Sequence, residues 1–149
     1  MKLSTKGRYG ARAAIELALN YGSGPIMVRE IAAHQDISER YLEHILNTLR
    51  ATGLVRSTRG AKGGYELARH PSAITLGDII TALEGSMDVV DCTSNDDCPK
   101  VSQCVMCQIW NEIKTAIEDI LNNLTLEEMA TRHARLQQTL PNSEPEYMI

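Results

Sequence analysis

Residues 38–67 read SERYLEHILNTLRATGLVRSTRGAKGGYEL. Ser38 is a residue type that caps helix N-termini, and apolar side chains follow it at helical spacing, at Leu42, Ile45, Leu46 and Leu49. The opposite face carries side chains that form hydrogen bonds: Glu39, Arg40, Glu43, His44 and Asn47. The stretch therefore predicts an amphipathic helix to about Ala51, with one face for a core and the other for an outside partner.

Two short predicted strands follow, joined by a basic, glycine-rich loop. Gly53 ends the helix, residues 54–57 and 65–68 form the strands, and the loop reads TRGAKGG. We expect Gly63 and Gly64 to supply positive φ angles for the turn. A phosphate-binding enzyme loop would need a helix directly after its glycines, and the residues that follow here favour a strand. The sequence thus predicts a β-hairpin with a basic tip, which is a wing.

The residues before Ser38 complete a helix-turn-helix. Residues 28–34 predict a short helix with an apolar face, and residues 35–37 form the turn. Two helices joined by a short turn, with a polar face on the second, are typical of DNA-binding proteins. A helix-turn-helix followed by a basic wing indicates binding to duplex DNA.

The first half of the chain is basic. Residues 1–70 hold 11 Lys and Arg against 6 Asp and Glu, whereas residues 71–149 hold 4 against 13. A predicted helix over residues 4–21, capped by Ser4, carries Lys2, Lys6, Arg8 and Arg12 at its start. Positive charge is unfavourable at a helix N-terminus. Solvent exposure alone explains the presence of charged residues, but not their separation into a basic first half and an acidic second half. We therefore expect an anionic partner for the first half alone.

The second half predicts a long helix with an apolar stripe. Thr75 caps a helix that ends at Gly85, and a further helix begins near Val105. Its stripe consists of Ile109, Ile113, Ile117, Ile120, Leu121 and Leu124, with Trp110 beside it. A twofold dimer is the usual partner for such a stripe, and packing onto the chain's own first helix is the alternative. We expect a last short helix from Thr125 through Met129.

All four cysteines lie between Cys92 and Cys107, spaced C-x5-C-x5-C-x2-C. Their surroundings are polar, with several Asp, Asn and Lys residues, so they do not form part of a core. Cys104 and Cys107 lie three residues apart at a predicted helix start, which favours thiolates on one face. Four thiolates suit a tetrahedral zinc ion or an iron–sulfur cluster, and redox-active disulfides are the alternative.

We expect a cytoplasmic protein that is not an enzyme. No run of about 18 apolar residues and no signal peptide is evident in the sequence. The cytosol is reducing, which favours a metal or a transient redox pair over permanent disulfides. The sequence contains no nucleophile–base pair or paired catalytic carboxylates, so we expect no small-molecule substrate. A small cluster-bearing electron carrier would not explain the basic wing.

The predicted fold is mainly α: a winged helix-turn-helix domain with a long dimerisation helix and a cysteine-rich loop. We expect the DNA-binding domain at residues 1–85, the cluster loop at 86–108, the dimerisation and short C-terminal helices at 105–135, and a flexible tail at 136–149. The partners are a double-stranded DNA operator and a second copy of the chain, without a membrane. The expected DNA contacts are Ser4, Thr5, Lys6, Ser38, Glu39, Arg40, Tyr41, Glu43, His44, Arg56, Arg59, Gly60 and Lys62.

These motifs together resemble the winged-helix transcription regulators typified by the iron–sulfur regulator IscR, whose relatives respond to nitric oxide or cysteine status. The resemblance covers roughly residues 1–130 and rests on the opening MKLSTKGRY, on ISERYLE at 37–43, and on GLV, RG and GGY at 53–55, 59–60 and 63–65. It implies that Glu43 and Arg59 read or gate base contacts. It also implies that Cys92, Cys98 and Cys104 are cluster ligands.

The fourth ligand departs from this pattern. The family's namesake has a histidine where this chain has Cys107, and relatives that use an acidic ligand from the first helix have it where this chain has Arg8. An all-cysteine site on one subunit follows, and its extra thiolate should lower the reduction potential. Family likeness favours [2Fe-2S], although four cysteines serve [4Fe-4S] equally. The other interpretation is a DNA-binding regulator with a structural zinc site or a thiol switch.

Overall fold

The computed structural model describes residues 2–93 and 98–140. Its helices are α1 (Thr5–Leu19), α2 (Val28–Gln35), α3 (Glu39–Ala51), α4 (Leu76–Glu84), α5 (Val105–Asn123) and α6 (Leu126–Thr139). The strands β1 (Val55–Thr58) and β2 (Gly64–Leu67) pair antiparallel, with Val55 opposite Leu67. Short 3-10 turns span Pro71–Ala73, Asp91–Thr93 and Val101–Gln103. The predicted winged, mainly α fold is confirmed.

The winged domain has one core, to which α1–α4, the hairpin and α6 contribute. The predicted apolar stripe of α3 lies at its centre, and Leu42, Ile45, Leu46 and Leu49 are all 0% exposed. Ser38 caps α3 as expected, since its hydroxyl accepts a hydrogen bond from the Tyr41 backbone N–H at 3.2 Å. Burying this stripe leaves the opposite side of α3 exposed to solvent.

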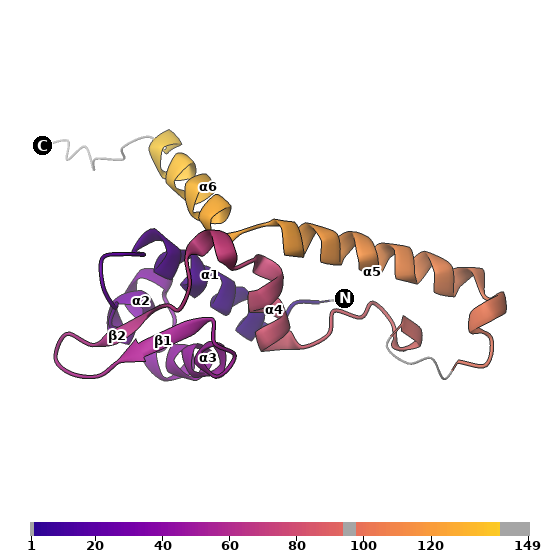
Figure 1. Ribbon diagram of the computed structural model, residues 1–149, viewed down its shortest axis with the longest axis horizontal. Coiled ribbons are helices and arrows are strands. Elements are labelled where there is room, and N and C mark those ends of the chain that lie inside the picture. The colour runs from indigo at the N-terminus through magenta and orange to yellow at the C-terminus, as the bar shows by residue number, and fades with distance from the viewer. Residues whose placement is uncertain (1, 94–97, 141–149) are drawn as a thin grey trace, which may run out of the picture.

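The long helix α5 extends away from the winged domain (Figure 1). It packs against α4, and it is α6 rather than α5 that packs along α1. At 19 residues, α5 is about 28 Å long, so much of it extends beyond the short α4. Ile109 and Ile113 are each 38% exposed and Ile120 is 67% exposed. The alternative in which this stripe packs onto the first helix is therefore not the arrangement observed.

Helix α6 is longer than the sequence predicted. We expected a short helix ending at Met129, and the structure continues it to Thr139. Residues 130–139 include several strong helix formers, and Arg132 pairs with Glu128 one turn earlier. Leu126 is fully buried, and its backbone N–H donates to the Ile74 carbonyl at 2.9 Å. The start of α6 is thus part of the winged domain's core. The flexible tail was expected at 136–149, but α6 includes residues 136–139, and residues 141–149 lie outside the described residues.

Within residues 2–93 and 98–140, no helix has the length and apolar character needed to cross a membrane.

Candidate functional site

The exposed side of α3 forms a shallow polar surface. Six residues line a hollow of about 490 Å³ there: Ser38, Arg40, Tyr41, Glu43, His44 and Asn47. Glu39 is also exposed on the first turn of this helix. The surface offers guanidinium, carboxylate, imidazole and amide groups side by side, and these are the groups that read base edges in the major groove.

The tip of the hairpin supplies positive charge beside α3. Arg59, Gly60 and Lys62 are all exposed, as the sequence predicted. Gly60 and Gly64 have positive φ angles of 111° and 153°. The expectation is thus confirmed for Gly64 and wrong for Gly63, where glycine is needed because a Cβ would lie 2.1 Å from the Thr58 carbonyl oxygen.

Arg56, which we expected to contact DNA, has a partner within the hairpin. Its Nε donates to Glu66 Oε1 on the facing strand at 2.9 Å. The Arg56 side chain remains 63% exposed, so the pair is a surface ion pair. A phosphate can still reach this guanidinium, but Arg56 is less available than the two cations at the hairpin tip.

Two hydrogen bonds that sequence reasoning missed fix the hairpin to α3. The Tyr65 hydroxyl of β2 donates to Asn47 Oδ1 at 3.0 Å, and Arg50 of α3 donates to the Ser57 hydroxyl of β1 at 3.1 Å. Burial raises the pKa of Tyr65, so this phenol stays protonated as a donor. The helix and the wing therefore present one surface.

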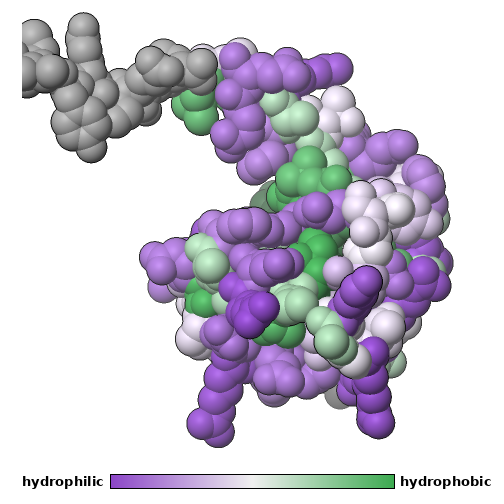
Figure 2. All heavy atoms as spheres, turned by 90° about the vertical axis from the view of Figure 1, so that its left-hand side faces the viewer, coloured by the Kyte–Doolittle hydropathy of each residue, from purple (hydrophilic) through white to green (hydrophobic). Residues whose placement is uncertain are grey.

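The start of α1 lies against the start of α3. The rings of Tyr9 and Tyr41 meet edge to face, with their centres 6.1 Å apart. Ser4 caps α1 by accepting a hydrogen bond from the Gly7 backbone N–H at 3.2 Å. Ser4 and Thr5 are exposed and Lys6 is half-buried. Figure 2, which views the molecule from the wing end, shows mostly hydrophilic side chains there, with hydrophobic ones between them.

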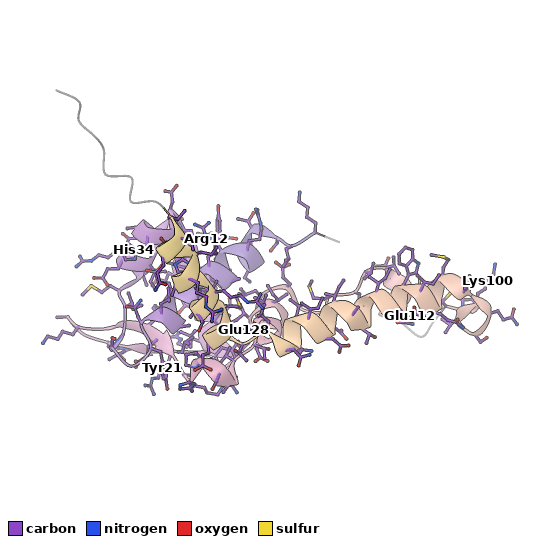
Figure 3. All side chains as sticks on the ribbon, turned by 90° about the horizontal axis from the view of Figure 1, so that it is seen from above. Arg12, Tyr21, His34, Lys100, Glu112 and Glu128 are labelled. Atoms are coloured by element: carbon purple, nitrogen blue, oxygen red, sulfur yellow. The ribbon has the colours of Figure 1, made fainter. Side chains whose placement is uncertain are left out.

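The four cysteines lie at the other end of the molecule, around the start of α5. Cys92 is exposed in the Asp91–Thr93 turn, Cys98 and Cys104 are half-buried, and Cys107 in the first turn of α5 is 4% exposed. Figure 3 labels Lys100, between Cys98 and Cys104, at the end of α5 farthest from the winged domain. Residues 94–97 of the predicted loop lie outside the described residues.

All four cysteines are free thiols, and their electrostatics show that they are neighbours. The backbone N–H of Cys107 lowers the pKa of Cys104. Burial, the hydrogen bond with Cys104 and the charges of Cys92 and Cys98 raise the pKa of Cys107 to about 11. No group of three or more His, Cys, Asp or Glu side chains among the described residues is arranged to hold a metal ion. The thiols thus gather at one end of α5 without forming a ready-made coordination sphere.

Comparisons with known proteins agree with this fold. The Rrf2 model, described as an iron-dependent transcriptional regulator, matches residues 3–132. The chain is 44% identical over 131 residues to the HTH-type transcriptional regulator CymR of Bacillus subtilis, spanning 88% of this chain and 91% of CymR. It is 37% identical over 137 residues to the HTH-type transcriptional regulator IscR of Vibrio parahaemolyticus, spanning 92% and 82%.

Solved structures show the same relationship. The structure of CymR, described as the global cysteine regulator of B. subtilis, has a TM-score of 0.76 at 42% identity and covers 89% of this chain and 98% of its own. That of T. potens IscR has a TM-score of 0.76 at 42% identity and covers 92% and 91%. The named relatives are regulators, as expected for a chain that is not an enzyme. The chain belongs to the Rrf2 family of transcriptional regulators.

Proposed function

We propose that this transcriptional regulator binds its operator as a homodimer in the cytoplasm and senses iron–sulfur cluster status through Cys92, Cys98, Cys104 and Cys107. The observation that carries the proposal is the gathering of four free thiols at the start of α5, beyond the winged domain. The description of the family as iron-dependent supports it.

The donor set fits such a cluster. Four thiolates complete the ligation of a [2Fe-2S] or a [4Fe-4S] cluster, and an all-cysteine [2Fe-2S] site is the form we propose. When bound, the cluster supplies electron transfer and sensitivity to oxidants. The chain itself holds two of the ligand positions on either side of a backbone turn, where the Cys107 N–H donates to the Cys104 carbonyl at 3.2 Å.

The exposed stripe of α5 supports the homodimer. Val105, Met106, Ile109, Ile113 and Ile120 are between 38% and 67% exposed. Such a stripe, on a helix that extends from the domain, matches a second copy of itself across a twofold axis. Two winged domains would then meet two half-sites at a separation set by α5 and the segment that carries the cysteines.

We propose separate roles for two segments of the chain. The operator contacts belong to the α1 start, α3 and the wing, and we retain residues 1–85 as the DNA-binding domain. Residues 86–108 are the sensing segment, which Lys114 of α5 anchors through its ion pair with Asp88 at 2.5 Å. Ordering that segment would change the spacing of the two domains, and thereby the affinity for DNA.

A second candidate keeps the DNA binding and assigns the thiols to a zinc site or a redox switch that responds to cysteine status. It is favoured by the 44% identity to CymR, by the description of that protein as a cysteine regulator, and by the lack of a converged ligand set in the described part of the chain.

One experiment separates the two candidates. The protein is purified without oxygen, and its visible absorption, iron and zinc are measured together with operator binding before and after removal of the bound metal. Iron with visible absorption and an affinity change of about fivefold or more are expected for a cluster sensor. Cys98→Ala should reproduce the stripped form, and Ser102→Ala in the same segment should not. Colourless protein with zinc supports the second candidate, and equal affinities exclude a sensing role.

A further inference from the structure

Two glycines inside α1 mark where another helix approaches it. Glycine is disfavoured in a helix interior, yet α1 contains Gly7 and Gly10, and both are buried. A Cβ at Gly10 would lie 2.0 Å from Leu83 Cδ1, and one at Gly7 would lie 2.4 Å from Glu84 Oε1. Because these two glycines have no side chains, the last turn of α4 can pack closely against the start of α1.

Glu84, the last residue of α4, binds the N-terminus of α1 through one carboxylate oxygen. Its Oε1 accepts hydrogen bonds from the backbone N–H groups of Ser4 and Gly7, both at 3.1 Å. The Ser4 hydroxyl donates to the same oxygen. The free N–H groups of a helix N-terminus need such acceptors, and this one comes from a residue 77 positions beyond Gly7.

The charge of Glu84 suits this position. The first turn of α1 contains no acidic residue, and the chain around it carries Lys2, Lys6 and Arg8. A negative charge near a helix N-terminus is stabilising because it opposes the helix dipole. Glu84 thus supplies, from α4, the negative charge that the first turn of α1 lacks. It stabilises a basic helix start that would otherwise tend to fray.

This helix start is part of the proposed DNA-binding surface. Ser4, Thr5 and Lys6 are its proposed contacts, and the Tyr9–Tyr41 ring pair connects it to the first turn of α3. We propose that Glu84 is a positioning residue for operator binding: without touching DNA, it fixes the start of α1 against α4, and α4 in turn packs against α3. The inference rests on the proposed DNA contacts of α1.

The direction in which DNA affinity changes when Glu84 is removed distinguishes a positioning role from a purely electrostatic one. Removing a carboxylate near DNA should, by charge alone, strengthen binding to every sequence, because phosphates repel it. Removing a positioning residue should instead weaken binding to the operator, where contacts must be placed accurately. Binding to random DNA should change little or rise slightly.

The test uses the full-length chain, a duplex that the wild-type protein selects from a random library, and a random duplex of equal length. Glu84→Ala should weaken binding to the selected duplex about fivefold, the factor that a helix cap is worth, and should not weaken binding to the random one. Glu84→Gln keeps an acceptor oxygen and loses the charge, so it should restore the part of the loss that comes from the hydrogen bonds. Glu112→Ala on α5, whose carboxylate is exposed, is the charge-matched control and should leave the ratio of the two affinities unchanged.

A second variant keeps the test decisive if Glu84→Ala folds poorly. Gly7→Ala preserves all charges and pushes a methyl group against the Glu84 carboxylate, so it should also weaken selected-duplex binding. Combined with Glu84→Ala it should add no further loss. A selected-to-random ratio that stays at the wild-type value in both single variants would overturn the proposal. Lys6→Ala tests the α1 contact separately, since it should weaken binding to both duplexes.

Discussion

Helices α3 and α5 carry similar apolar stripes and have different environments. In α3 the four stripe residues are fully buried in the winged domain. In α5 the stripe retains large exposed side chains at Ile109, Ile113 and Ile120. Its other members, Ile117, Leu121 and Leu124, are half-buried, and α5 packs against α4. The difference shows that an apolar stripe predicts that a helix face will be buried, but not which surface will cover it. The chain itself covers α3, and we propose that a second copy covers α5.

The polar groups of the two regions differ in the same way. In the winged domain the buried carboxylate of Glu16 binds His34 and Gln35, and no buried side-chain N or O atom in the described part of the chain lacks a hydrogen bond. At the start of α5 the four thiols are free and close together. The buried polar side chains of the winged domain thus have their partners within the chain, whereas the free thiols at the α5 end suit an added partner.

The largest expected effect is on stability. Ile45→Ala should lower the free energy of unfolding by about 2–5 kcal/mol, because it opens a cavity in a fully packed core. Ile120→Ala, at a site that is 67% exposed, should change the stability of the winged domain far less. Denaturant unfolding at a protein concentration low enough to dissociate dimers measures both. Equal losses would mean that α5 belongs to the same core.

The next effect concerns assembly. Ile109→Glu combined with Ile113→Glu should yield a monomer, because it places charges in the proposed dimer interface. Operator affinity should then fall about a hundredfold, since two linked half-site contacts become one. Analytical ultracentrifugation and DNA binding measure the outcome, with Glu112→Gln as a control on the same helix. A stable dimer in the double variant would rule out this stripe as the interface.

A smaller effect separates base reading from phosphate contact. Glu43→Ala should cost about 1–3 kcal/mol of discrimination at one base pair of the operator and leave binding to random DNA almost unchanged. Lys62→Ala at the wing tip should instead weaken binding to both and reduce the salt slope by about 1. Binding titrations at several salt concentrations distinguish these patterns. A uniform loss for Glu43→Ala would remove it from the reading residues.

The smallest expected effect is a pH dependence of the stability of the winged domain. The hydrogen bond to Glu16 raises the pKa of His34 above its ordinary value of 6.5, so the folded state holds this proton more tightly than the unfolded state. The stabilisation is therefore fully present below pH 6.5 and is lost as the pH rises through the higher folded-state pKa. His34→Gln should flatten the fall in unfolding free energy over that window.

Local sequence signals predicted much of the winged domain. Ser38, the α3 stripe and Gly53 each act within a few residues, so the helix and its ends follow from spacing and capping alone. The residues that join elements were missed, because Tyr65 with Asn47 and Glu84 with Gly7 are far apart in the sequence. Gly7 and Gly10 inside a predicted helix were the only signal, since glycine there indicates close approach by another element.

Short-range periodicity and spacing are enough to specify the order of elements, the polar face of α3, the basic wing and the grouping of four cysteines. Contacts between distant parts of the chain were needed to show that α6 rather than α5 covers α1, that Arg56 pairs with Glu66, and that Glu84 caps α1. Those outcomes depend on which surfaces meet after the chain folds back on itself. An apolar stripe can pack against several surfaces, and a charged side chain can pair with several groups. The packing of the whole chain selects among these partners.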